Sequence, residues 1–138
     1  MNDSAQQPVA VVTGAARGIG LAIAKWFTHQ GYRVAMVDIE ADALSHATQG
    51  MSQAQTMGVV CDVSDEAAVT RCAEQVMANW GRVDALVNNA GVASFATAAQ
   101  TTAKEWRDTI NARVDACRWQ PGQHRREPHL QRAADRLV

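Results

Sequence analysis

The chain has few aromatic residues, few cysteines and no excess of charge of either sign. Phe, Trp and Tyr make up 5% of its 138 residues, with a single tyrosine among them. The formal net charge of −1 produces no field that would attract nucleic acid or an anionic membrane. The cysteines, Cys61, Cys72 and Cys117, lack the spacing of a metal site. We therefore expect neither a nucleic-acid partner nor a metal ion.

Long apolar runs are also missing. No stretch approaches the ~20 apolar residues that a membrane-spanning helix requires. The polar segment 1–8 has no apolar centre of the kind found in a secretory leader. An odd number of cysteines without a leader is typical of a reducing compartment. The sequence therefore predicts a soluble, cytoplasmic protein that has no membrane partner.

The composition changes near residue 113. Residues 1–112 hold seven of the 13 basic and 11 of the 14 acidic residues. Residues 113–138 hold six arginines, three acids and two of the three prolines, without helical or strand periodicity. We expect a folded unit over 1–112 and an irregular or disordered tail over 113–138.

Within 1–112, short apolar runs alternate with helical patterns. The runs predict strands at 9–12, 34–37, 57–61 and 83–87. Helices are expected between them and over about 102–110, with Gly31 and Gly81 ending two of them and Ser64 as an N-cap. Two apolar stripes are expected to face the sheet: Ile19, Ala22, Ile23, Trp26 and Phe27 in one helix, and Val69, Cys72, Ala73, Val76, Met77 and Trp80 in another.

This alternation predicts the α/β class, with a Rossmann-type doubly wound parallel sheet truncated to about four strands. In the expected order 3-2-1-4, the fourth strand lies at an edge. An unpaired apolar edge is a template for pairing with other chains, so we expect a homo-oligomer or aggregation through it.

The segment Thr13-Gly14-Ala15-Ala16-Arg17-Gly18-Ile19-Gly20 joins the first strand to the first helix. Its spacing, G-x-x-x-G-x-G, differs from the G-x-G-x-x-G fingerprint, but a strand precedes it and a helix follows it. Gly14 permits a tight turn, and Gly18 and Gly20 allow a phosphate and the sheet to approach closely. Such a corner predicts a dinucleotide pyrophosphate at the helix N-terminus. The alternative is a strand–turn–helix corner without a ligand.

Asp38 ends the second strand, 18 residues after Gly20. A carboxylate at about this distance hydrogen-bonds the ribose hydroxyl of NAD and would repel the 2′-phosphate of NADP. Arg17 has the opposite tendency because it can reach a phosphate. We take Asp38 as the stronger influence and expect NAD rather than NADP. The alternative is a solvated loop acid.

The third and fourth strands also end in polar residues. Asp62 and Val63 are candidates for contacting adenine, although Asp62 fits the role of a turn former nearly as well. Asn88-Asn89-Ala90-Gly91 pairs two amides with two small residues, which suits a crowded polar crossing where the backbone passes close to a ligand or a strand. All these segments follow strands, at the edge where open α/β sheets bind ligands.

Together these motifs resemble the short-chain dehydrogenase/reductase family over residues 8–112. The resemblance implies that Asn89 braces the central strands. It also implies an NAD site lined by Gly14, Ile19, Asp38, Asp62, Val63, Asn88 and Gly91. With Arg17, Gly18, Gly20 and Ala90 from the glycine loop and the fourth strand end, these residues are the candidate cofactor site.

The family oxidises alcohols or reduces ketones with a Tyr-x-x-x-Lys pair, a serine and an asparagine. Here the only tyrosine, Tyr32, has no lysine four residues later. Asn111 lies five residues after Trp106, where the family spacing is seven. We assign no catalytic residue. The expectation is a truncated, catalytically incomplete NAD-dependent oxidoreductase whose full-length relative acts on a small alcohol or ketone. The alternatives are a non-catalytic NAD-binding module and a non-functional truncation product.

The tail suggests a further hypothesis, that residues from about 113 arise from a shifted reading frame or a faulty gene model. Reading the degenerate codons of residues 122–130 from their second base permits a Gly-Asn-Ile-Val run followed by an asparagine and a serine. That run resembles the family's strand before its catalytic serine. Nucleotide sequencing through codon 113 tests this, because an intact single frame would refute it.

Overall fold

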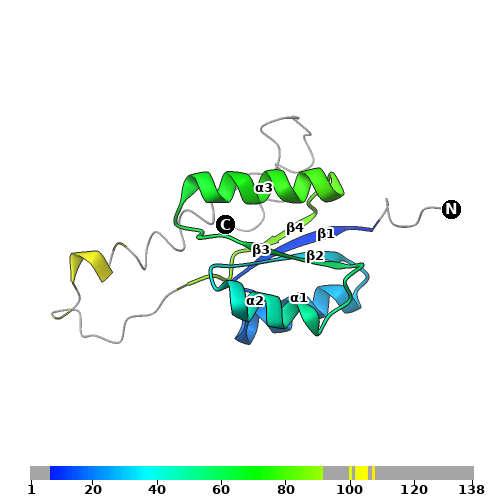
Figure 1. Cartoon of the computed structure of the whole chain (residues 1–138), viewed down its shortest axis with the longest axis horizontal. Coiled ribbons are helices and arrows are strands. Elements are labelled where there is room, and N and C mark those ends of the chain that lie inside the picture. The colour runs from blue at the N-terminus through cyan, green and yellow to red at the C-terminus, as the bar shows by residue number, and fades with distance from the viewer. Residues whose placement is uncertain (1–6, 92–99, 101, 106, 108–138) are drawn as a thin grey trace.

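The computed structural model describes residues 7–91, 100, 102–105 and 107. Their main feature is a parallel sheet of four strands with helices on both faces (Figure 1). In chain order the elements are β1 (Val9–Thr13), α1 (Gly18–His29), β2 (Arg33–Asp38), α2 (Ala41–Gln49), β3 (Thr56–Val60), α3 (Glu66–Trp80) and β4 (Ala85–Val87).

The strand order is β3-β2-β1-β4, as the sequence predicts. Figure 1 shows α3 on one face of the sheet and α1 and α2 on the other. The chain therefore passes from one face to the other after β3, which gives the doubly wound arrangement. The predicted strands are all present, with bounds that differ by one or two residues.

The core has two halves because successive side chains of a strand point to opposite faces. On one face Val9, Val11, Ala35 and Val37 pack with α3. On the other face Val12, Val34 and Met36 pack with α1 and α2. Most strand residues of β1 and β2 are buried on both faces, which accounts for their uninterrupted apolar sequence.

The predicted stripe of α1 is partly wrong. Ile23 and Phe27 pack against the core, but Ile19 is 73% exposed and Trp26 is 56% exposed. Ala22 is exposed as well. The residues of α1 that are fully buried are Gly20 and Ala24, whose small size lets the helix lie close to the sheet. The spacing of bulky apolar residues therefore does not predict the face of α1 that lies closest to the sheet, because that face carries small residues.

The N-cap of helix α3 lies one residue later than the sequence predicts. Asp65, rather than Ser64, is the N-cap, and its carboxylate accepts a hydrogen bond from the Ala67 amide. The amide and the hydroxyl of Ser64 instead both donate to Oδ1 of Asp62. Gly81 ends the helix in the left-handed conformation, as expected.

Strand β4 is shorter than predicted, beginning at Ala85 rather than Val83. The Val9 amide donates to Oδ2 of Asp84, at 2.7 Å, and the Asp84 amide donates to the Val9 carbonyl. The Asp84 side chain thus accepts the hydrogen bond that a backbone carbonyl of a neighbouring strand would otherwise accept from Val9. Arg82 donates to the same Asp84 carboxylate at 2.6 and 2.8 Å. Val83 remains buried in the core beside this junction.

The predicted helix near residue 102 is described only at its start. Residues 103–105 are helical. The Thr102 hydroxyl accepts from the Glu105 amide, and the Glu105 carboxylate accepts from the Thr102 amide, which is a reciprocal capping box. Asn111, Cys117 and the tail 113–138 lie outside the described residues, so the boundary at 112 stays a prediction. No helix among the described residues is long and apolar enough to cross a bilayer.

Candidate functional site

The candidate site residues follow the carboxyl ends of the strands, as the sequence predicts. Gly14 follows β1, Asp38 ends β2, and Asp62 lies just after β3. Because all four strands are parallel, these ends share one edge of the sheet. The Cys61 amide donates to the Asp38 carbonyl at 3.0 Å, which continues the alignment of β3 with β2 beyond the strand.

Two of the loop glycines are required by packing within the protein. A Cβ on Gly14 would lie 2.9 Å from Cα of Ala90, and one on Gly20 would lie 2.6 Å from Nδ2 of Asn89. Gly14 also has a φ of +65°, which a larger residue adopts with strain. These glycines let the loop, the start of α1 and the end of β4 pass close together.

Thr13 and Asn89 join the ends of β1 and β4. The Asn89 side-chain amide donates to the carbonyls of Thr13 and Gly14, each at 3.2 Å. The Thr13 hydroxyl accepts from the amides of Asn89 and Ala90 and donates to the Val87 carbonyl. This confirms the bracing role that the resemblance gave to Asn89.

The start of α1 is suited to an anion. Gly18 begins the helix with a φ of +56°, and a Cβ there would meet nothing within 4 Å. The first turn contains no acidic residue, and no side chain caps it. The first amides of a helix lack intrahelical partners and carry the positive end of its dipole. Gly18 therefore faces open space at an electropositive helix end.

Asp38 is held by the glycine loop. Its Oδ2 accepts a hydrogen bond from the Ala16 amide at 3.0 Å, and its Oδ1 accepts from the Glu40 amide at 3.1 Å. Beside it, Arg17 forms an ion pair with Glu40, with a nitrogen–oxygen distance of 2.7 Å. The structure thus brings Asp38 to the loop just before α1, and it places Arg17 against a carboxylate.

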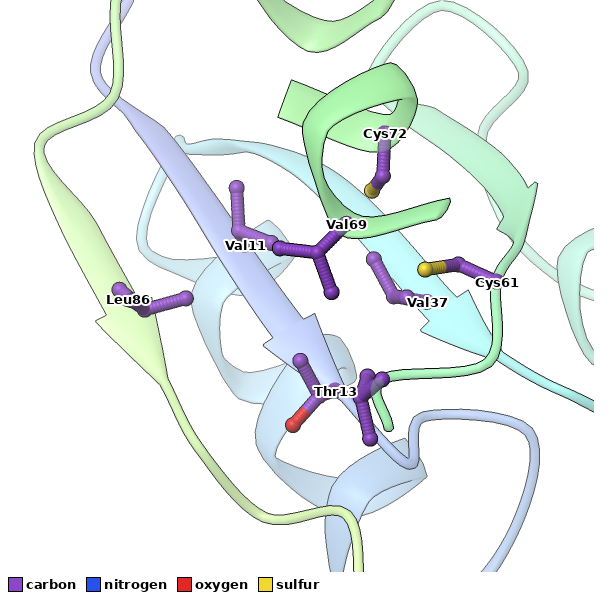
Figure 2. A pocket seen from close by; sticks show the side chains of 8 residues that line it. Val11, Thr13, Val37, Cys61, Val69, Cys72 and Leu86 are labelled. Atoms are coloured by element: carbon purple, nitrogen blue, oxygen red, sulfur yellow. The ribbon is translucent and has the colours of Figure 1, made fainter. Parts of the chain in front are cut away.

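Asp62 and Val63 have contacts of their own. Oδ1 of Asp62 accepts both bonds from Ser64, so the turn-forming role is present. Val63 lines an apolar, half-open cavity of about 20 Å³ between α3 and the sheet (Figure 2). The other lining residues are Val11, Thr13, Val37, Cys61, Val69, Cys72 and Leu86. The cavity is too small for a coenzyme, and it lies on the α3 side of the strand ends.

The thiols of Cys61 and Cys72 lie together in this cavity wall (Figure 2), and both are free and buried. A hydrogen bond from Cys72 lowers the pKa of the Cys61 thiol, although burial and the charges of Asp62 and Asp65 oppose this. The same hydrogen bond, together with burial, raises the pKa of Cys72. Among the described residues, no three His, Cys, Asp or Glu side chains gather as metal ligands.

Sequence reasoning missed two residues of the site. The sequence pattern assigns Thr13 to the loop alone, although its hydroxyl holds the start of the segment after β4. The pattern gives Glu40 no role, although it contacts Arg17. Their contacts join residues far apart in the sequence, so a local pattern carries no signal for them. Asn88 and Gly91, which were singled out, are exposed at the same edge.

Known proteins match this chain over its N-terminal four-fifths. The family described as short chain dehydrogenase matches residues 8–119. D-threitol dehydrogenase of Mycolicibacterium smegmatis is 43% identical over 104 residues, which are 74% of this chain and 40% of that protein. The chain spans about two-fifths of the length of the curated relatives it matches.

Solved structures agree with the sequence matches. The 3-ketoacyl-(acyl-carrier-protein) reductase of Brucella melitensis, complexed with NADH, has a TM-score of 0.76 at 31% identity. L-Sorbose reductase of Gluconobacter frateurii, complexed with NADPH and L-sorbose, has a TM-score of 0.75 at 32% identity. Each match covers 80% of this chain, and 45% and 43% of the respective structures. One of these two relatives is thus seen with the coenzyme that lacks the 2′-phosphate, and the other with the coenzyme that carries it.

Proposed function

The chain belongs to the short-chain dehydrogenase/reductase family of oxidoreductases, and from that premise we propose that residues 8–112 bind NAD at the carboxyl edge of the sheet. The observation that carries the proposal is the pairing of an open, uncapped helix N-terminus at Gly18 with the carboxylate of Asp38. The first suits a pyrophosphate and the second suits a ribose.

The pyrophosphate is proposed to lie against the first turn of α1. Gly18 leaves room for it, since no atom lies within 4 Å of the position where a Cβ would stand. Ile19, which is exposed beside that turn, would cover the coenzyme with apolar surface. Gly14 and Gly20 act indirectly, because they allow the loop to take this shape.

Asp38 is proposed to accept hydrogen bonds from the adenosine ribose. Each carboxylate oxygen has two lone pairs, so the amides of Ala16 and Glu40 leave capacity for hydroxyl donors. A 2′-phosphate at the same place would be repelled by the carboxylate. This is the basis for proposing NAD rather than NADP.

The remaining contacts are assigned by their position. Asp62 and Val63 follow β3 next to β2 and are proposed to contact adenine. The exposed Asn88 and Gly91, with Ala90 between the two strand ends, are proposed to line the part of the site nearer the nicotinamide.

The proposed reaction is hydride transfer between the nicotinamide and a small alcohol or ketone, with a polyol as the favoured substrate because D-threitol dehydrogenase is among the relatives. Bound NAD supplies the hydride chemistry itself, and the protein binds and orients it. The sequence contains no Tyr-x-x-x-Lys pair. Tyr32 comes just before β2, at the opposite end of the strand from Asp38, and packs on Phe27 with ring centroids 4.9 Å apart. We therefore propose that these 138 residues bind the coenzyme without turning it over.

A reducing compartment such as the cytoplasm fits this proposal, since Cys61 and Cys72 are free thiols. The folded coenzyme-binding unit is proposed to end at about residue 112. We also propose that the residues after it arise from a shifted reading frame. The nucleotide sequence through codon 113 tests the proposed frame shift.

The test is calorimetry of the full chain with NAD and with NADP. Saturable binding of NAD, at least about tenfold tighter than that of NADP, is expected, together with thermal stabilisation by NAD. Asp38→Asn is expected to reduce the discrimination, whereas Glu74→Gln, an exposed acid on α3, serves as the matched control. Absence of binding to either coenzyme by folded protein refutes the proposal. Formation of NADH from D-threitol or another secondary alcohol refutes the absence of turnover.

A further inference from the structure

Arg17 and Glu40 stand at equivalent places in the fold, each at the N-cap position of a helix. Arg17 precedes α1, and Glu40 precedes α2. Their side chains meet at 2.7 Å across the two loops, with 65% and 59% of the side chains exposed. Neither side chain caps its own helix. The two side chains form an ion pair with each other instead.

Asp38 joins the two loops that carry this pair. It accepts hydrogen bonds from Ala16, which precedes Arg17, and from Glu40 itself. The carboxylate of Asp38, proposed to hold the 2′ side of the ribose, is thus bonded to the backbone next to Arg17 and to that of Glu40. The guanidinium of Arg17 is bound to the carboxylate of Glu40.

An arginine at such a place has two competing partners. Its planar guanidinium binds phosphate with two parallel hydrogen bonds, and it binds a carboxylate in the same way. The contact with Glu40 occupies one nitrogen of the Arg17 guanidinium and offsets its charge, which makes the guanidinium less available to a phosphate. The exposed pair is weak on its own, so it tunes the choice of coenzyme rather than fixing it.

We propose that Glu40 is a specificity-determining residue that holds Arg17 in an ion pair and withholds its guanidinium from a 2′-phosphate on the adenosine ribose. This inference rests on the proposed coenzyme site. It assigns the rejection of the phosphorylated coenzyme to two acids, Asp38 by direct repulsion and Glu40 by occupying Arg17.

The experiment compares 5′-AMP with 2′,5′-ADP as probes for the full chain, because they differ only in the 2′-phosphate. Calorimetry gives the ratio of the two dissociation constants for the unchanged chain, Glu40→Gln, Arg17→Gln and the double variant. All four are also made in an Asp38→Ser background, where the loss of the repelling carboxylate brings 2′,5′-ADP binding into range.

Glu40→Gln is expected to shift the ratio toward 2′,5′-ADP by about threefold to tenfold. The double variant is expected to lose that shift, because it lacks the guanidinium. Asp42→Asn is the matched control: Asp42 is an exposed acid in the first turn of α2, and no ion pair of the described residues includes it. Far-UV circular dichroism of each variant checks that the helices are retained.

The outcomes separate the two proposals. Binding of 5′-AMP with an unchanged ratio in Glu40→Gln overturns the role of Glu40 alone. An equal shift in Asp42→Asn, or a shift that persists without Arg17, also overturns it, since either result means that net charge acts without the ion pair. Failure of every folded variant to bind 5′-AMP or NAD refutes the coenzyme site, and this inference with it.

Discussion

Gly20 lies directly against the carbonyl group of Gly14, so that a Cβ on Gly20 would overlap the Gly14 oxygen and stand 2.6 Å from Nδ2 of Asn89. The first turn of α1 is thereby packed onto the end of β1. The nearest neighbour is the Gly14 carbonyl, which is backbone and cannot move aside as the end of a flexible side chain could. The glycine is therefore a requirement of the fold before it is a requirement of any ligand.

Gly20→Ala is expected to lower the free energy of unfolding by about 3 kcal/mol, the upper end of what overpacking costs. Urea denaturation measures it. The matched control is Gly50→Ala at the end of α2, where φ is −80° and the nearest atom to a Cβ is 3.7 Å away. That change is expected to alter stability by less than about 1 kcal/mol. Equal effects at the two positions would contradict the packing argument.

Asn89→Asp is expected to destabilise the fold by about 2–4 kcal/mol. The side-chain amide donates to two carbonyl oxygens, and a carboxylate in its place has no proton to donate and repels both. Asn88→Asp makes the same chemical change at the exposed neighbour and is expected to be nearly neutral for stability. Thermal unfolding of the two variants at neutral pH gives the comparison.

The Asp84 carboxylate is expected to make stability depend on acid. Burial raises its pKa, but hydrogen bonds from Arg82 and the Val9 amide, with the charges of Arg82 and Arg33, outweigh burial and lower it below the ordinary 3.8. A lowered folded-state pKa stabilises the protein above the unfolded value, and this contribution is lost as pH falls through the folded value.

The stability difference between the unchanged chain and Asp84→Asn should therefore shrink as the pH falls from about 6 to about 3. We expect it to stay under about 1 kcal/mol, because the ion pair is partly exposed to solvent. Asp42→Asn controls for the loss of a carboxylate elsewhere. A pH-independent difference at Asp84 would mean that its charge is not what Arg82 and Val9 recognise.

Cys72→Ala is expected to raise the pKa of Cys61, because it removes the hydrogen bond that is the main cause of the lowering. The measurement is the pH midpoint of Cys61 alkylation by iodoacetamide, followed on its own peptide by mass spectrometry. Cys72→Ser keeps a donor and is expected to leave the midpoint low. If both variants shift it equally, the hydrogen bond is not the cause.

Strand β4 is expected to promote association. In the described part of the chain, β1 is its sole sheet neighbour, so its other edge is open. Light scattering over a range of concentrations should show growing mass, and Ala85→Lys should reduce it by placing a charge on the edge. A monomer at high concentration would count against the homo-oligomer.

The strand order and the location of the site follow from local features of the sequence. Buried parallel strands read as apolar runs, and crossovers between them are right-handed, so few topologies remain once the runs are found. The positions of Gly14 and Asp38 were predictable too, because Gly14 follows a recognisable strand and Asp38 ends one.

Contacts between distant residues were not predictable in this way. A local detail was missed as well: the pattern does not show that the Ser64 hydroxyl donates to Asp62 while Asp65 caps the helix. The exposure of Ile19 depends on α1 approaching the sheet through Gly20, a residue that hydrophobicity does not highlight. The contact of Arg17 with Glu40 requires the loops after β1 and β2 to be aligned first.

The hydrogen bonds between Asn89 and the turn after β1 join positions 75 and 76 residues apart. On a chain emerging from the ribosome, the first turn and helix are made long before the asparagine that secures them. Closing such a long loop is slow compared with forming a helix. The glycine turn therefore reaches its final shape late in folding, and the first forty residues made alone should not capture a nucleotide.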